Sequence, residues 1–270
     1  MDSLKRSMLV AALLVVAVSV QAQHTIGLSA GYGTGTVRFD PKQETRSVGG
    51  RYSAGLSWRY YSATRFVGCV GVDVELLQRG FSYAPYASIT ENEADYRYYT
   101  RKLNSITVPL VWQPHFYLVN RHVRVYLEAA LTFSYHFDSS YENEVALDNG
   151  VEPWRGKYEF KLPRDNRWGY GLAGGAGVAL LFGRFELSGG VRYYFGYSDL
   201  LRNRSKYYDN VTDNTAENPF WYTPQRSPMD NMMIRVGVAY RFAPEFRSWN
   251  VKPPKREKES REFNFGPVKK

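Results

Sequence analysis

Apolar and polar residues alternate with a period of two along most of this chain. In the stretch Arg51–Tyr60 every second residue is apolar, and the residues between them are small, hydroxylated or basic. Successive side chains of a strand point to opposite faces, so such a stretch has one apolar face and one polar face. The pattern recurs eight times and predicts an all-β chain. The eight segments are Thr25–Gly33, Arg51–Tyr60, Phe66–Leu76, Asn104–Trp112, His122–Phe137, Trp168–Phe182, Phe185–Phe195 and Met232–Phe242.

The connections between these segments alternate between short and long. The short ones are 61–65, 119–121 and 183–184, and the long ones are 38–48, 82–101, 138–164 and 197–230. An even number of antiparallel strands, with short turns at one end and long loops at the other, is typical of outer-membrane barrels. We therefore predict an eight-stranded antiparallel up-and-down transmembrane β-barrel over residues 23–242. Its short turns would be periplasmic and its long loops extracellular.

A soluble barrel would alternate in the same way, but its polar face would be a solvent surface, which is usually rich in Lys and Glu. Here the polar face consists mainly of Gly, Ser, Thr and Arg, and the clearest strands contain no Lys. The apolar rows extend over about 9–11 residues, the length that a tilted strand needs to cross a bilayer. Aromatic residues gather at the ends of these rows, as expected at a membrane interface. The sequence therefore favours a barrel whose apolar rows contact outer-membrane lipid.

The first 22 residues have the pattern of a secretory signal peptide. Lys5 and Arg6 precede the apolar run Met8–Val20, and Val20-Gln21-Ala22 offers small residues for cleavage. The run is too short for a spanning helix. We predict a signal peptide at residues 1–22 and export to the cell outer membrane.

If the apolar rows face lipid, the charged residues of the polar rows point into the barrel. An interior of about eight strands is just wide enough to be filled by side chains, so these charges should pair as arginine–carboxylate contacts. The favoured interpretation is a plugged, polar interior rather than a general porin. The alternative is a narrow channel that favours anions, because the predicted arginines outnumber the acids. The predicted interior charges are Arg51, Arg59, Asp73, Glu75, Arg124, Glu128, Arg184, Glu186, Arg192, Arg235 and Arg241.

Several segments resemble the PorT-like outer-membrane β-barrel family of Bacteroidota-type bacteria. The run Gly71–Phe81 resembles its third strand, and Leu103–Leu110, with a proline inside the strand, resembles its fourth. Trp168–Val178, Val191–Tyr194 and Val236–Phe242 resemble its sixth, seventh and last strands. The resemblance implies an eight-stranded outer-membrane barrel. It also implies a link to the type IX secretion apparatus for some members, although this chain departs in its long fourth loop and extended tail.

Candidate chemistry is sparse. The four histidines have no metal-ligand spacing, the single cysteine excludes an internal disulfide framework, and no helix follows the glycine-rich run at 31–35, so we predict no metal, cofactor or catalytic residue. Ser134 and His136 invite comparison with small-barrel lipid hydrolases. The alternative function is therefore a surface enzyme that acts on lipid or peptide.

The predicted loops and the C-terminal tail offer possible partner contacts. Rigid aromatic side chains bind glycans, peptides or proteins at low entropy cost, or else pack on one another to stiffen a loop. The tail, residues 243–270, holds eight basic and four acidic residues and is predicted to be disordered alone. Because much of the net charge of +9 lies there, the charge does not imply nucleic acid. We expect an envelope scaffold or an accessory subunit of an outer-membrane complex, which contacts a periplasmic or outer-membrane protein through this tail. The loop aromatic candidates are Tyr96, Tyr98, Tyr99, Trp154, Trp221 and Tyr222.

Overall fold

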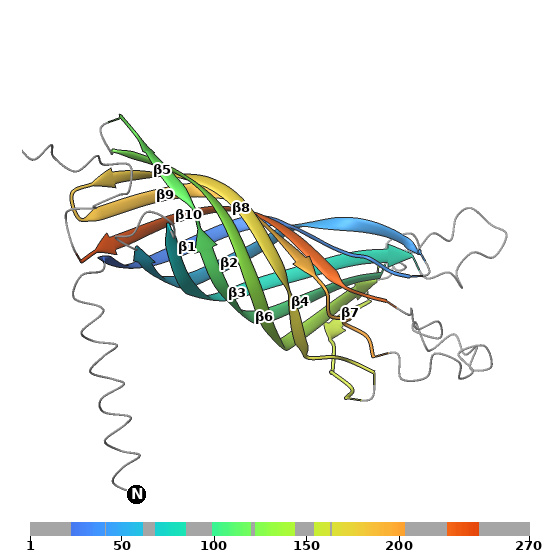
Figure 1. The fold of residues 1–270 in the computed structure, drawn as a ribbon. Helices are drawn as coiled ribbons and strands as arrows, with labels where there is room; N and C mark the ends of the chain where they lie inside the picture. Colours follow the sequence, from blue (N-terminus) through green and yellow to red (C-terminus); the bar gives the residue numbers. More distant parts are fainter. Residues whose placement is uncertain are drawn as a thin grey trace, which may run out of the picture.

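Eight long antiparallel strands close into a barrel in the computed structural model of the chain (Figure 1). The structure describes residues 23–40, 42–61, 68–84, 99–119, 122–143, 154–162, 164–202 and 226–242. The predicted signal peptide and tail lie outside these residues, so both stay predictions. No helix in the described ranges is long and apolar enough to cross a bilayer.

The strands follow one another around the barrel wall, and β6 closes the ring by pairing with β4. Two short strands extend the wall: β5 lengthens the β4–β6 ladder at one end, and β7 adds to β6 at the other. The predicted fold class is confirmed. The strands are β1 Gln23–Val37, β2 Glu44–Tyr61, β3 Cys69–Ala84, β4 Tyr99–Gln113, β5 His115–Leu118, β6 Val123–Asn143, β7 Trp154–Lys157, β8 Trp168–Phe182, β9 Phe185–Gly196 and β10 Met229–Arg241.

The two ends of the barrel differ. One end, called the turn end below, carries the first residue of β1, the last of β10 and the β8–β9 turn at 183–184 (Figure 1). The other, called the loop end, carries the connections before and after β7 and the link between β9 and β10. Closure at the turn end includes the amide of Phe242, which donates to the His24 carbonyl at 3.1 Å.

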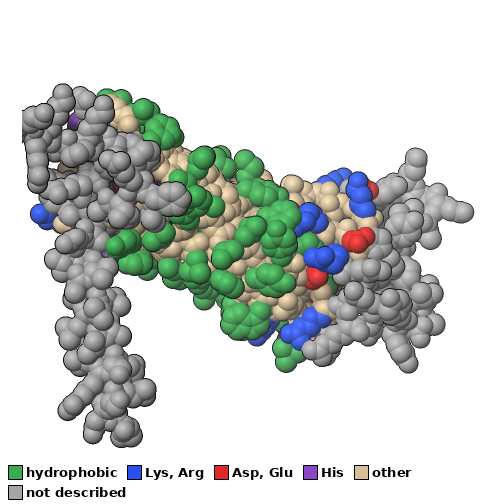
Figure 2. Space-filling model, viewed as in Figure 1, with side chains coloured by type: hydrophobic (Ala, Val, Ile, Leu, Met, Phe, Trp, Pro, Cys, Tyr) green, Lys and Arg blue, Asp and Glu red, His purple; other side chains and the backbone are tan. Residues whose placement is uncertain are grey.

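The apolar rows face outward. Leu28 and Val236 are 65% and 60% exposed, whereas Asp73 and Arg124, on the opposite face of their strands, are 0% and 1% exposed. Figure 2 shows the outward side chains on the visible face of the barrel as a wide hydrophobic band, with charged side chains beyond it at the loop end. This inverts the arrangement of a soluble barrel, because burial of apolar area in water would send the same rows inward. The exposed band is what a lipid environment requires.

The strands extend beyond the alternating segments, mainly at the loop end. β8 has the predicted bounds, but β2 begins at Glu44 and β6 continues to Asn143. The prediction of a long first loop at 38–48 is therefore wrong, because only residues 38–43 separate β1 from β2. Both faces of these extensions are mostly polar or mixed, so they carry no apolar row by which the sequence could indicate a strand.

One proline and one glycine have identifiable effects on the barrel wall. Pro114 lacks an amide donor and separates β4 from β5, but its carbonyl still accepts the Leu127 amide at 3.0 Å. Gly71 leaves room for the Arg59 side chain on the inner face of the wall. A Cβ at position 71 would lie 2.2 Å from the Trp58 carbonyl oxygen and 2.7 Å from Arg59 Cδ. This glycine therefore positions one of the interior arginines.

Candidate functional site: the charged interior of the barrel

Arg192 of β9 lies at the centre of the barrel and contacts three carboxylates. Its Nη1 lies 2.6 Å from Glu75 and its Nη2 lies 2.8 Å from Asp73, both on β3, and its Nε donates to Glu128 on β6. Inward residues of strands on opposite walls thus meet in one contact set. Arg192 and Glu75 are each 1% exposed.

Two further arginines complete what we call the central cluster: Arg59, Asp73, Glu75, Glu128, Arg192 and Arg235. Arg59 forms a two-pronged ion pair with Asp73, and its Nη2 donates at 3.0 Å. Arg235 lies 2.7 Å from Glu75 and also donates to Ser29 at 2.8 Å. The cluster thus holds three arginines and three carboxylates, a balance that limits the cost of burying charge.

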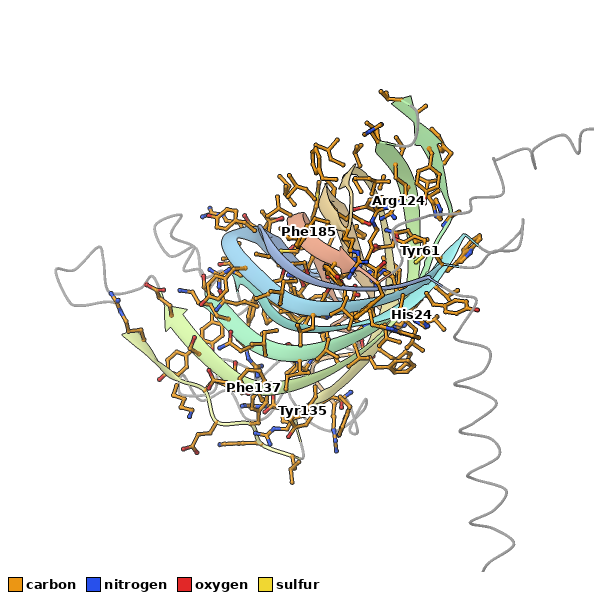
Figure 3. All side chains as sticks on the ribbon, turned by 90° about the vertical axis from the view of Figure 1, so that its left-hand side faces the viewer. His24, Tyr61, Arg124, Tyr135, Phe137 and Phe185 are labelled. Carbon is orange, nitrogen blue, oxygen red and sulfur yellow. The ribbon has the colours of Figure 1, made fainter. Side chains whose placement is uncertain are left out.

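A second charged layer lies nearer the turn end. Arg124 of β6 pairs with Glu186 of β9, and its guanidinium lies 4.8 Å from the centre of the Tyr61 ring. Figure 3, viewed from the turn end, shows Arg124 and Tyr61 next to each other. Arg241 is buried close by and donates to the carbonyl of Gly183. The interior charges therefore form separate layers rather than one network.

One of the predicted interior residues lies outside the interior, and a second lies inside it but apart from the central cluster. Arg184 is in the β8–β9 turn, where its side chain is exposed and donates to the Tyr240 hydroxyl at 2.9 Å, so its assignment to the interior was wrong. The reason is that the turn interrupts the alternation, so the period-two register cannot be carried through it. Arg51 is buried, but it lies away from the carboxylates and donates to the Gly49 carbonyl at 3.0 Å.

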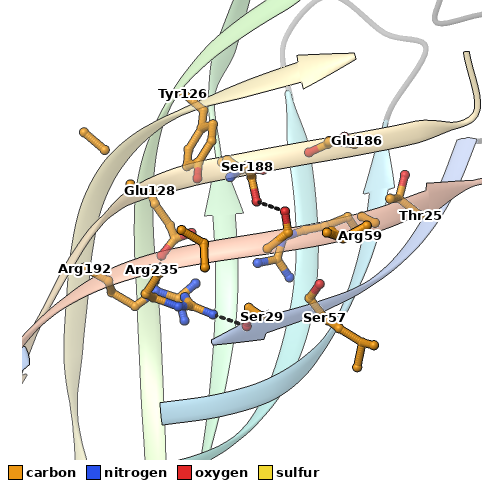
Figure 4. A pocket seen from close by; sticks show the side chains of 18 of the residues that line it. Thr25, Ser29, Ser57, Arg59, Tyr126, Glu128, Glu186, Ser188, Arg192 and Arg235 are labelled. Atoms are coloured by element: carbon orange, nitrogen blue, oxygen red, sulfur yellow. Dashed lines mark hydrogen bonds and ion pairs between the residues drawn. The ribbon is translucent and has the colours of Figure 1, made fainter. Parts of the chain in front are cut away.

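A polar cavity of about 70 Å³ lies between the two charged layers (Figure 4). Serines and a threonine line part of it, and Arg59, Arg235 and Glu186 border it. Its volume suits a few water molecules. A continuous water-filled pore would leave its lining atoms open to water, yet Asp73 is fully buried and Arg192 is nearly so. The central cluster therefore fills this level of the interior with side chains.

The loop end is filled by residues that the sequence analysis did not assign to the interior. Arg101 of β4 lies 3.5 Å from Asp165 and stacks 3.6 Å from the centre of the Tyr158 ring, and the Tyr158 hydroxyl donates to Asp165 at 3.0 Å. Burial raises the pKa of Tyr158, which lies beyond the spanning strands, to about 12. Arg79 is also buried and donates to Ser134 at 3.2 Å. Arg101 and Asp165 were not predicted as interior residues because their neighbours in the sequence are mostly polar, so no apolar row indicates which way these segments face.

A hydrophobic cluster closes the interior at the same end. It combines strand residues with residues that follow β7 and β9, so these connections fold back over the barrel mouth. Tyr99 belongs to it and is 5% exposed, which corrects its prediction as an exposed loop aromatic. The cluster contains Val37, Phe81, Tyr83, Tyr99, Leu103, Tyr158, Leu200, Leu201 and Met229.

The structure describes no side chain of the remaining loop aromatic candidates. Tyr96, Tyr98, Trp221 and Tyr222 lie outside the described residues, and Trp154 begins β7. Their role in binding stays a prediction.

Ser134 and His136 do not pair with each other. His136 Nδ1 lies 2.6 Å from the Ser105 hydroxyl, whereas Ser134 contacts Thr107 at 3.0 Å and Arg79. All three serine and histidine side chains are buried inside the barrel, where a lipid or peptide has no access. Within the described ranges, no group of three or more His, Cys, Asp or Glu residues could hold a metal ion.

Several solved structures are similar to this chain at low sequence identity. Neisserial surface protein A is 14% identical, with coverage of 81% of this chain and 97% of that one and a TM-score of 0.37. Ail, the attachment invasion locus protein of Yersinia pestis, is 14% identical, with coverage of 82% and 99% and a TM-score of 0.35. A major outer membrane protein from Thermus thermophilus is 12% identical, with coverage of 82% and 99% and a TM-score of 0.42.

Among curated protein sequences, none matches this chain. The family described as outer membrane protein beta-barrel domain matches residues 21–202, which is more than half of the sequence. The inverted barrel, with apolar rows outside and ion pairs inside, agrees with that match. The chain belongs to the outer membrane protein beta-barrel domain family.

Proposed function

We propose that this barrel is a scaffold of the cell envelope or an accessory subunit of an outer-membrane complex, and that it does not conduct solutes. The observation that carries the proposal is the burial of Arg192 with its three carboxylates across the middle of the interior. Opening a path would require these charges to separate in a confined space, which is costly. The barrel wall and its ends are then the surfaces left for function.

The finer proposal places the chain among PorT-like barrels, with an association with type IX protein secretion. Its support is the order of the strand motifs, among them the run Gly71–Phe81 and the strand proline Pro109. The partner contact is assigned to the basic tail at 243–270, which follows the last strand at the turn end. A basic segment with interspersed aromatic residues suits an acidic surface of a periplasmic protein.

The first test is conductance of the purified full chain in planar lipid bilayers. The proposal predicts no sustained unit conductance. A steady conductance with anion selectivity would overturn it in favour of a narrow channel.

The second test is co-purification from detergent-solubilised membranes, with the full chain, a chain lacking residues 243–270, and a matched chain with the tail residues in shuffled order. We expect one envelope protein to co-purify at a fixed ratio with the full chain and to be lost on deletion. Retention by the shuffled tail would assign the contact to the composition of the tail rather than to the order of its residues. If the full chain purifies without any stoichiometric partner, the accessory-subunit proposal fails.

A further inference from the structure

Lysine and arginine side chains gather at the loop end, directly beyond the hydrophobic band (Figure 2). Four basic residues of this end are close in sequence and lie on or after β7, which pairs with β6. Arg155 and Lys157 are on β7, which pairs with the outer part of β6. Lys161 lies in the turn after β7, and Arg167 directly precedes β8. We call these four residues the basic rim.

Most of the basic rim is free of ion pairs. Arg155, Lys161 and Arg167 form none with the residues that the structure describes, and Lys157 Nζ reaches only to 3.9 Å from Asp138 with its side chain 81% exposed. Among the described residues, the other carboxylates near this hairpin are Glu159, which is exposed, and Glu142, which pairs with Lys102 at 3.4 Å. Asp165 is also near, but it is buried and lies 3.5 Å from Arg101. Within the described part of the chain, the basic rim thus keeps a local excess of positive charge.

Two arginines elsewhere at the loop end are paired. Arg38 lies 2.8 Å from Asp230, and Arg226 lies 3.1 Å from Asp199. Arg226 therefore serves as a paired cation with which the basic rim can be compared.

Aromatic side chains lie directly below the basic rim. Arg167 donates to the Tyr135 hydroxyl at 3.3 Å, and its guanidinium lies 4.7 Å from the centre of the Phe160 ring. The centres of the Tyr135 and Trp168 rings lie 4.8 Å apart, and Trp168 is 68% exposed. Tryptophan and tyrosine favour the level at which acyl chains meet headgroups, so Arg167 is held at headgroup depth.

We propose that the basic rim binds the phosphate groups of an outer-leaflet lipid, whose acyl chains lie along the wall below Trp168 and Tyr135. Guanidinium and ammonium groups form strong charge-assisted hydrogen bonds with phosphate oxygens. The guanidinium of Arg167 is oriented at the rim by the hydrogen bond from its Nη1 to the Tyr135 hydroxyl. A lipid is favoured over a soluble phosphate because the cations and an exposed apolar wall are contiguous, so one molecule satisfies both. The inference rests on the membrane location and not on the proposed scaffold role.

The test is lipid binding by the purified full chain in an uncharged detergent, measured by native mass spectrometry. The probe is diphosphoryl lipid A, and the comparison probe is the same lipid without its phosphates. The variant combines Lys157→Gln, Lys161→Gln and Arg167→Gln, and the matched control is Arg226→Gln, which removes a paired cation of the same end. Heat-modifiable electrophoretic mobility shows that each variant is folded.

We expect the triple variant to bind the phosphorylated lipid at least about tenfold more weakly, since each basic residue near such a surface contributes appreciably to binding. The control should stay within about twofold. If Lys157→Gln with Lys161→Gln alone, both at exposed positions, leaves binding unchanged and Arg167→Gln does so too, the proposal fails. Equal affinity for the dephosphorylated lipid also overturns it. Full competition by millimolar inorganic phosphate would assign the site to a soluble anion instead.

Discussion

Replacing Arg192 is the perturbation with the largest expected effect on folding. In Arg192→Gln the three carboxylates of Asp73, Glu75 and Glu128 stay buried, and Glu128 loses the one ion-pair partner shown for it among the described residues. Removing one member of a buried charged set typically costs about 3–5 kcal/mol, because the remaining charges lack compensation. We expect a loss of that size in the free energy of unfolding.

The assay is urea-induced unfolding in lipid vesicles, followed by tryptophan fluorescence in both directions. The exposed turn substitution Arg184→Gln is the control, and we expect it to change stability by less than about 0.5 kcal/mol. Adding Glu128→Gln to Arg192→Gln should recover part of the loss, with a coupling energy within the range of about 0.5–3 kcal/mol seen for contacting residues. If Arg192→Gln costs no more than the control, the buried ion pairs do not contribute to folding and the reasoning is refuted.

Three other predictions follow from the wall and the loop end. Val236→Arg, on the lipid face, should destabilise the barrel in vesicles by about 2–4 kcal/mol if the residue lies near the bilayer midplane; an unchanged urea midpoint would contradict this. Gly71→Val should lower the free energy of unfolding by about 1–3 kcal/mol or prevent barrel closure, because its Cβ would lie 2.2 Å from the Trp58 carbonyl oxygen. The control Gly49→Val should cost far less, because a Cβ there has no neighbour within 4 Å. Heat-modifiable electrophoretic mobility and urea unfolding compare the two variants. The Tyr158 phenol has a raised pKa of about 12, so its contribution to the free energy of unfolding is complete below the unfolded pKa of about 10 and is lost as the pH rises through 12. In a titration followed by absorbance at 295 nm, Tyr158→Phe should lack one late-titrating phenol. Identical titrations of the two proteins would count against a buried phenol.

The sequence was most informative where one face of a strand meets lipid. β8 was predicted with its correct bounds because Leu172, Val178 and their outward neighbours form an apolar row interrupted only by Gly174. The alternation also placed Asp73, Glu75 and Arg192 on inward faces. It could not show that Arg192 reaches all three carboxylates, since this depends on barrel diameter and on the stagger between strands far apart in the chain.

Prediction failed where the alternation lost its contrast. In β4, Tyr99, Arg101 and Leu103 point inward, but their outward neighbours are polar as well, so the segment resembled a loop. Asp165 lies in a connection, and its contact with Arg101 depends on how that connection folds into the barrel mouth. The one sign in the sequence was that Tyr99, Arg101 and Leu103 stand at every second position. Because these three residues do not share a polarity, that sign was too weak to place the start of β4 at Tyr99.

The direction in which the apolar rows face can be measured directly by spin labelling in lipid vesicles. Single cysteines are placed along β10 at positions 234–238, in a background whose natural cysteine has been replaced, and each nitroxide is tested for collision with oxygen and with an aqueous nickel complex. Labels at Ile234, Val236 and Val238 should collide most with oxygen, which concentrates in the hydrocarbon, and labels at Arg235 and Gly237 should not. Oxygen collision that is highest at 235 and 237, or uniform along the strand, would contradict the account.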